Sequence, residues 1–138
     1  MKTNVSSVFN VGQIVAQYMI KEGKGKIINI ASVQTALARP GIAPYTTTKG
    51  AVSNLTKGMA TDWASKGLQV NAIAPGYFKT PLNAALVADA DFSSWLKKRT
   101  PAGRWGKGIL IMPRHRELSS TTRHFWAIPG TFGHNRAF

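Results

Sequence analysis

Hydrophobic residues near the amino end of the chain recur at intervals of three to four positions. Over residues 1–22 this spacing gathers one face of small and apolar side chains, at Val5, Val8, Phe9, Gly12, Val15, Ala16 and Met19. Such a period is typical of an amphipathic helix, and Gly23 directly after it is a helix-ending residue. The pattern therefore predicts a helix over residues 1–22.

A short β-branched run comes next. Residues 26–31, KIINIA, follow a glycine-rich turn and precede a loop that contains serine, which predicts a buried strand. Ser32 lies directly beyond the carboxyl end of that strand. The following residues, VQTALARPGI, contain a Pro-Gly pair and no clear period, so they predict a loop.

A second helix and a second strand follow the loop. Pro44 suits a first helical position, where the missing N–H costs nothing and the fixed φ is already helical. The helix continues through an apolar stripe and ends near Gly67; the stripe consists of Val52, Leu55, Met59 and Trp63. Residues 68–74, LQVNAIA, alternate in hydrophobicity and predict a strand, which PGYFKTP then ends.

The order of helix, strand, helix and strand indicates an α/β fold. Two such strands form a parallel pair joined by a right-handed crossover, which is part of a doubly wound sheet. Open sheets of this kind bind ligands at the carboxyl ends of their strands, where Ser32 and the Pro75–Gly76 loop are expected. Residues 81–99 predict one or two short helices, and both a mobile lid and an ordinary surface helix fit them.

Tyr45 and Lys49 form the first candidate for chemistry. They are four residues apart in the opening turns of the second helix, so their side chains lie on one face. A phenol is a poor acid or base near neutrality, and an adjacent ammonium together with a helix amino terminus favours its phenolate form. The pair fits an acid–base device, although the same spacing also occurs on ordinary helices with a half-buried tyrosine and a solvated lysine.

Composition narrows the functional classes. A chain of 138 residues with 43% hydrophobic residues can form one small globular domain. The absence of cysteine excludes disulfides, thiolate metal sites and a cysteine nucleophile, and fits the reducing cytoplasm. We also find no signal-peptide pattern and no apolar run near the roughly 20 residues that span a bilayer, so we predict no membrane association.

The net charge of +13 favours partners that carry phosphate. The basic residues are scattered, however, and the only run is KKR at 97–99. No helix-turn-helix, zinc-finger or aromatic nucleic-acid motif accompanies them, so we predict no specific nucleic-acid binding. We also predict no metal site, because His115, His124 and His134 are too widely spaced for a compact ligand motif.

Several motifs together resemble the short-chain dehydrogenase/reductase family. GKIINIAS resembles its strand leading to the catalytic serine, YTTTK its Tyr-x-x-x-Lys, and VNAIAPG its Asn-x-x-x-Pro-Gly segment. Asn4, in TNVSSVF, falls at the position of the family's fourth catalytic residue. The sequence of residues 57–82 and 99–107 is most similar to the branch of the family that contains gluconate 5-dehydrogenase and related sugar-acid or polyol enzymes.

This resemblance implies a secondary alcohol–ketone oxidoreductase that uses NAD or NADP. Tyr45 would exchange a proton with the substrate oxygen, and Lys49 would favour the phenolate and bind the nicotinamide ribose. Ser32 would hold the substrate oxygen, and Asn4 would position a water in the proton path. The carboxamide end of the nicotinamide would contact a further group, made of Pro75, Gly76, Phe78 and Thr80.

The resemblance covers residues 1–107 and only the second half of the family's Rossmann-like fold. The family's glycine-rich turn, which binds the cofactor pyrophosphate, has no counterpart in the sequence. Residues 108–138 also depart from the family, with arginine but no lysine and no sustained period. Their abrupt change in composition suggests the hypothesis of an altered reading frame.

Three hypotheses for function follow. The first is an oxidoreductase acting on a sugar acid such as gluconate, which is a fragment or receives its missing half from another polypeptide. The second is a noncatalytic module that forms homo-oligomers, or pairs with related chains, through the helices predicted at 1–22 and 44–66. The third is a basic fragment that associates with nucleic acid without catalysis.

Overall fold

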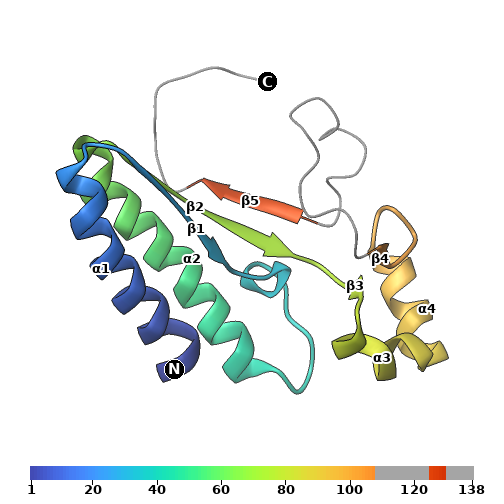
Figure 1. Ribbon diagram of the computed structural model, residues 1–138. Helices are drawn as coiled ribbons and strands as arrows, with labels where there is room; N and C mark the ends of the chain where they lie inside the picture. The colour runs from blue at the N-terminus through green and yellow to red at the C-terminus, as the bar shows by residue number, and fades with distance from the viewer. Residues whose placement is uncertain (108–124, 130–138) are drawn as a thin grey trace. The chain divides into compact units, whose positions relative to one another are not determined.

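The computed structural model describes residues 1–107 and 125–129. They fall into two compact units, and each is described by itself. The first comprises residues 1–74 with 127–129, and the second comprises residues 75–107 with 125–126. Figure 1 shows their helices and strands.

The first unit alternates helices with strands. A short π-helix, Lys2–Ser6, leads into α1, Ser7–Lys21, and the strand β1, Gly25–Ile30, follows. A 3₁₀ turn at Val33–Thr35 precedes the long helix α2, Ala43–Trp63. A second 3₁₀ turn, Ala64–Lys66, then connects α2 to β2, Leu68–Pro75. This order is the one that the hydrophobic pattern predicts.

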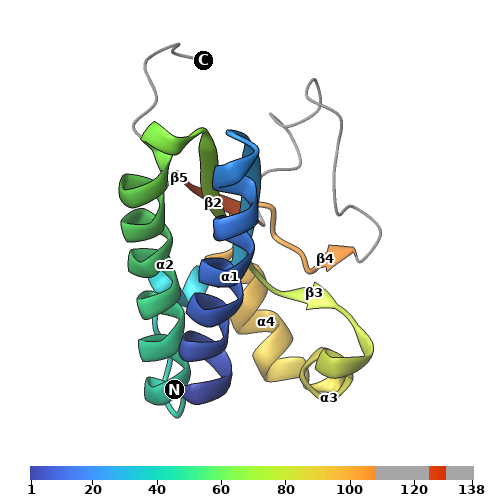
Figure 2. The same cartoon turned by 60° about the vertical axis from the view of Figure 1, so that its left-hand side comes forward.

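The sheet confirms the predicted parallel pair. β1 and β2 run parallel, in a register from Gly25 opposite Leu68 to Ile30 opposite Ile73. A strand that the sequence did not predict, β5 (Phe125–Pro129), follows β2 in the order β1-β2-β5. Helices α1 and α2 lie side by side along the β1–β2 pair (Figures 1 and 2). The first unit is therefore part of a doubly wound α/β fold.

Helix α2 supplies much of the apolar core of this unit. Val52, Met59 and Ala60 are almost fully buried, and they pack in two clusters with residues of β2. The buried positions of β2 alternate along the strand, at Leu68, Val70, Ala72 and Ala74. The period of two that predicted the strand is thus the period with which it meets the helix layer.

A buried polar contact joins α2 to β1. Asn29 Nδ2 donates to Thr56 Oγ1 at 2.9 Å, and Thr56 Oγ1 donates to the carbonyl oxygen of Val52 at 2.8 Å. Thr56 is 0% exposed. Buried polar groups require partners, because an unpaired one loses its hydration without compensation.

Replacing Thr56 with valine is expected to lower the free energy of unfolding by about 1–3 kcal/mol, since the shape is kept while the Asn29 amide loses its oxygen acceptor and keeps only the sulfur of Met59, 3.8 Å away. Urea unfolding followed by circular dichroism measures the change. The matched control is Thr61→Val, where an exposed hydroxyl donates to the Lys57 carbonyl within the same helix. Thr61→Val should change the free energy of unfolding by no more than about 0.5 kcal/mol. Equal losses in the two variants would contradict the role of the buried contact.

The second unit contains short elements. They are β3 (Phe78–Lys79), a 3₁₀ turn (Pro81–Asn83), α3 (Ala84–Ala88), α4 (Ala90–Arg99) and β4 (Gly106–Lys107). Helices α3 and α4 confirm the prediction of one or two short helices within residues 81–99, whereas the parallel pairing of β3 with β4 was not predicted. Tyr77, Phe92 and Trp105 pack ring against ring, with centroids 5.6–6.1 Å apart.

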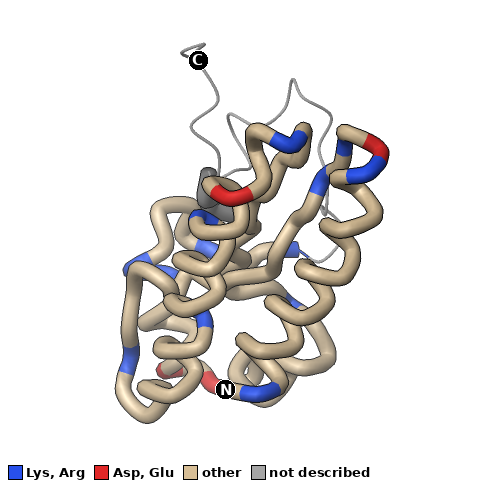
Figure 3. Tube along the Cα trace, turned by 90° about the vertical axis from the view of Figure 1, so that its left-hand side faces the viewer, with Lys and Arg blue, Asp and Glu red and all other residues tan. Residues whose placement is uncertain are grey.

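Lys and Arg residues are scattered along the described chain rather than gathered in one segment (Figure 3). Within the described residues, no helix has the length and hydrophobicity needed to cross a bilayer. His115, His124 and His134 lie outside the described residues, as does most of the segment 108–138. The boundary predicted at residue 107 and the altered reading frame stay predictions.

Candidate active site

The amino-terminal turns of α2 carry Tyr45 and Lys49. The helix begins at Ala43 with Pro44 in its first turn, so the two side chains fall on one face, as their spacing predicts. Lys49 Nζ lies 5.8 Å from the centre of the Tyr45 ring. Tyr45 is 41% exposed, which leaves its side chain accessible to a small molecule.

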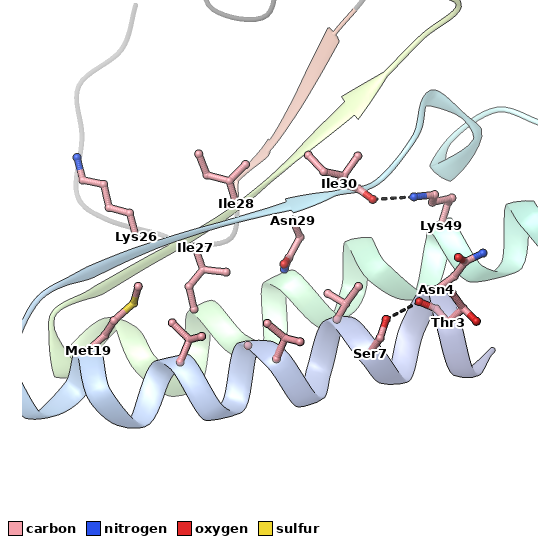
Figure 4. Close-up of a pocket in the computed structure, with 14 residues that line it drawn as sticks. Thr3, Asn4, Ser7, Met19, Lys26, Ile27, Ile28, Asn29, Ile30 and Lys49 are labelled. Carbon is pink, nitrogen blue, oxygen red and sulfur yellow. Dashed lines mark hydrogen bonds between the residues drawn. The ribbon is translucent and has the colours of Figure 1, made fainter. Parts of the chain in front are cut away.

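Lys49 is also bound to the neighbouring strand. Its Nζ donates to the carbonyl oxygen of Ile30, the last residue of β1, at 2.8 Å (Figure 4). The backbone of Lys49 is also bound, because Thr35 Oγ1 in the Val33–Thr35 turn donates to the Lys49 carbonyl at 3.2 Å. These contacts hold the ammonium group at the carboxyl end of β1, two residues before Ser32.

Ser32 caps the 3₁₀ turn that follows β1. Its Oγ accepts from the backbone N–H of Gln34 at 3.2 Å, and the residue is 6% exposed. A serine hydroxyl has one proton and two acceptor positions, so this bond uses an acceptor position and not the proton. The hydroxyl proton remains chemically suited to a substrate oxygen.

Asn4 reaches the same helix from the π-helical first turn of the chain. Its Nδ2 donates to Thr48 Oγ1 across 3.5 Å, a long bond, and Thr48 Oγ1 donates to the Tyr45 carbonyl at 2.8 Å. Thr48 is buried and lies between the predicted tyrosine and lysine along the helix. The structure thus connects Asn4 to the Tyr45–Lys49 turn through a threonine.

A groove of about 570 Å³ runs between α1 and β1 (Figure 4). Asn4 and Lys49 line one end of it, and Lys26 and Met19 line the other. Most of the remaining lining is aliphatic, with Val8, Val11, Val15, Ile27, Ile28 and Ile30. Two of the four catalytic candidates, Asn4 and Lys49, therefore lie at one end of a largely apolar groove, whereas Ser32 and Tyr45 do not line it.

The second set of predicted site residues begins at the end of β2. Pro75 is the last residue of β2, Gly76 follows it, and Phe78 lies in β3. Thr80 occupies the N-cap position of the Pro81–Asn83 turn, where its side chain makes no capping hydrogen bond. All four belong to the second unit, whereas Asn4, Ser32, Tyr45 and Lys49 belong to the first.

Sequence reasoning missed Thr48, Thr35 and the Ile30 carbonyl as groups that hold the candidate site. Thr48 had a local signal, because a hydroxyl three positions after Tyr45 reaches the Tyr45 carbonyl within one helical turn. The Ile30 carbonyl had none, since it is a backbone acceptor brought to Lys49 by the packing of α2 beside β1.

The family model for short chain dehydrogenases matches residues 1–91. The chain belongs to this family. Among curated relatives, it is 68% identical over 107 residues to the gluconate 5-dehydrogenase of Gluconobacter oxydans, covering 78% of this chain and 42% of that protein. It is 38% identical over 135 residues to the 2-dehydro-3-deoxy-D-gluconate 5-dehydrogenase of Bacillus subtilis, covering 94% of this chain and 53% of that protein.

A solved relative supports the fold. The crystal structure of a gluconate 5-dehydrogenase from Burkholderia cenocepacia, in complex with NADP and tartrate, is 66% identical, with a TM-score of 0.75. The matched part covers 78% of this chain and 42% of that one. The chain thus spans about half or less of the length of these relatives, and its fold is the corresponding part of a Rossmann-like sheet.

Proposed function

We propose that this chain carries the proton-transfer part of an NAD(P)-dependent active site that interconverts a secondary alcohol and a ketone. The observation that carries the proposal is the Tyr45–Lys49 pair, with Lys49 Nζ fixed on the Ile30 carbonyl at 2.8 Å just before Ser32. The names of the relatives favour a sugar acid such as gluconate as the substrate.

Each residue has a role that its chemistry fits. Tyr45 exchanges the proton with the substrate oxygen, and the Lys49 ammonium lies 5.8 Å from the centre of its ring. The Ser32 hydroxyl donates to the same substrate oxygen and orients it. Asn4, joined to this turn through Thr48, supports the path by which the proton leaves.

The bound cofactor supplies or accepts the hydride. An exposed tyrosine beside an ammonium group fits the hydroxyls of the nicotinamide ribose, so Tyr45 and Lys49 would hold that end of the cofactor. Pro75, Gly76, Phe78 and Thr80 would hold the carboxamide end. The pyrophosphate has no matching glycine-rich turn in the sequence, and the choice between NAD and NADP stays open.

Binding measured by ¹H–¹⁵N NMR tests this proposal on the chain itself. Reduced nicotinamide mononucleotide, which is the ribose and ring half of the cofactor, should shift the amide signals around Lys49. AMP, the other half, should leave them unchanged at physiological salt, because the sequence lacks the glycine-rich turn that holds the cofactor phosphates in this family.

Lys49→Met should remove most of the shift, and Lys57→Met, a change at an exposed lysine two turns along the same helix, should preserve it. Equal shifts with AMP, or shifts that survive Lys49→Met, would overturn the assignment and indicate a general attraction of anions to the +13 chain.

A second candidate is a noncatalytic module that pairs with itself or with a related chain. Large apolar side chains are exposed along α1, with Val11 62%, Ile14 57% and Tyr18 68% accessible. Helices with such a face commonly serve as interfaces. The helices predicted at 1–22 and 44–66 would form this contact. For either function, the cytoplasm stays the predicted location of the chain.

A further inference from the structure

Helix α2 carries three consecutive threonines directly after Tyr45. Thr47 is exposed, and its hydroxyl donates to the Ala43 carbonyl within the helix at 3.0 Å. Thr48 is 5% exposed, and its hydroxyl meets both Tyr45 and Asn4. Because the two residues have the same side chain, their different contacts come from the direction in which each leaves the helix. Thr48 is thus the one of this pair that can act on the candidate site.

The hydroxyl proton of Thr48 is already used. A carbonyl oxygen can only accept, so the 2.8 Å bond to the Tyr45 carbonyl places that proton on the line between the two oxygens. A hydroxyl carries one proton, and toward Asn4 the Thr48 oxygen can therefore only accept. The Asn4 atom that faces it across 3.5 Å must be the donor Nδ2 and not the acceptor Oδ1. The proton count thus selects one orientation of the Asn4 amide.

This orientation decides what Asn4 offers to a ligand. With Nδ2 turned to Thr48, the Oδ1 acceptor is directed away from it. Asn4 and Lys49 both line the same end of the groove between α1 and β1 (Figure 4). A water at that end can accept from the Lys49 ammonium and donate to Oδ1, whereas the opposite orientation of the amide would present a second donor beside the ammonium.

We propose that Thr48 is a positioning residue, which holds the Asn4 amide so that Oδ1 is the atom available to water beside Lys49. Its meaning for proton transfer rests on the proposed function, whereas the orientation itself rests on the two hydrogen bonds of Thr48. Thr48 acts through Asn4 and does not itself touch the substrate or the cofactor.

The surroundings of Asn4 make such a hold necessary. Asn4 is exposed, and it lies in the π-helix Lys2–Ser6, which has no side-chain cap. Water competes for both ends of an exposed amide, so without a fixed partner the side chain samples several rotamers. One neutral hydrogen bond to the buried Thr48 oxygen favours a single orientation by about two- to tenfold.

Hydrogen exchange of side-chain amides, followed by NMR on the whole chain, tests the proposal without cofactor. The Asn4 signals are assigned by their absence in Asn4→Ala. Asn10, which is exposed on α1, is the internal reference. The Nδ2 protons of Asn4 should exchange about two- to tenfold more slowly than those of Asn10, because one of them is bound to Thr48. Equal rates for the two amides in the parent chain would overturn the proposal, whether or not a variant folds.

Three variants identify Thr48 as the partner. Thr48→Val keeps the shape and removes the hydroxyl, so the Asn4 amide should exchange as fast as the Asn10 amide. Thr48→Ser keeps the hydroxyl and should retain the slow exchange to within about twofold. Thr47→Val removes the neighbouring exposed hydroxyl and should leave the Asn4 amide unchanged. Equal exchange in Thr48→Val and Thr48→Ser would contradict a hold through the hydroxyl.

Titration with reduced nicotinamide mononucleotide separates this proposal from the proposed function. Thr48→Val should keep the shifts around Lys49, since the Ile30 carbonyl and Thr35 hold that residue. Loss of the shifts in Thr48→Val would indicate general damage to the helical turn and would refute a role through Asn4. Failure of the parent chain to bind would refute the proposed cofactor site, while the exchange rates of Asn4 would still decide the orientation of its amide.

Discussion

Replacing Tyr45 with phenylalanine is expected to reduce kcat for the proposed oxidation of gluconate by about 10²–10⁴-fold, measured on a mixture of this chain with the complementary segment of a relative. The substitution removes only a hydroxyl from a side chain that is 41% exposed, so it changes little in the packing of α2. In the proposed mechanism Tyr45 transfers the proton, whereas Ser32 only donates a hydrogen bond to the substrate oxygen, so the substitution removes the acid–base group.

Separate measurements of kcat and of cofactor binding identify the role. Loss of proton transfer lowers kcat far more than it weakens cofactor binding, whose dissociation constant should rise by no more than about tenfold, as expected for one lost hydrogen bond to the nicotinamide ribose. Tyr18→Phe is the matched control, since Tyr18 is 68% exposed on α1 and lies outside the groove lining, and its turnover should equal that of the unmodified assembly. Turnover by Tyr45→Phe within twofold of the parent would refute the assignment.

An assembly that binds cofactor and shows no turnover would favour a different conclusion. In that case the Tyr45–Lys49 turn would retain the binding geometry of the family without its chemistry. The exposed face of α1 would then support the noncatalytic pairing module. The two functions are thus separated by kcat and not by affinity.

The sequence predicts the parts of the fold that follow a hydrophobic period. β2 shows why, since its alternating residues Leu68, Val70 and Ala72 are the buried ones. β3 and β4 have only two residues each, too few to show a period. β5 lies in a segment without sustained patterning, so its pairing depends on the sheet edge that β2 offers.

The candidate site also contains residues that the sequence predicts and contacts that it does not. Tyr45 and Lys49 are predictable because one helical turn fixes their proximity, and Ser32 because it ends a strand. The contacts of Lys49 with Ile30 and of Asn4 with Thr48 span 19 and 44 residues. They arise from the packing of α2 against β1 and against the π-helix Lys2–Ser6, which no local pattern encodes.

Replacing Gly67 with alanine is expected to destabilise the first unit more than any other single methyl addition in its turns. Gly67 has φ of +85°, a left-handed conformation that costs a residue with a Cβ about 1–2 kcal/mol. A Cβ there would also overlap the carbonyl oxygen of Gly23, where the turn after α1 meets the turn before β2. Because the obstacle is backbone, relief requires that the amino ends of β1 and β2 separate.

We therefore expect Gly67→Ala to lower the free energy of unfolding by about 3 kcal/mol or more, the sum of the backbone strain and the overlap. Gly23→Ala is the matched control, since Gly23 has φ of +66° and nothing lies within 4 Å of its added Cβ. That variant should lose only about 1 kcal/mol from its left-handed backbone. Urea midpoints measure both changes. Equal losses would show that the two turns do not touch, and the close approach at the amino ends of β1 and β2 would be wrong.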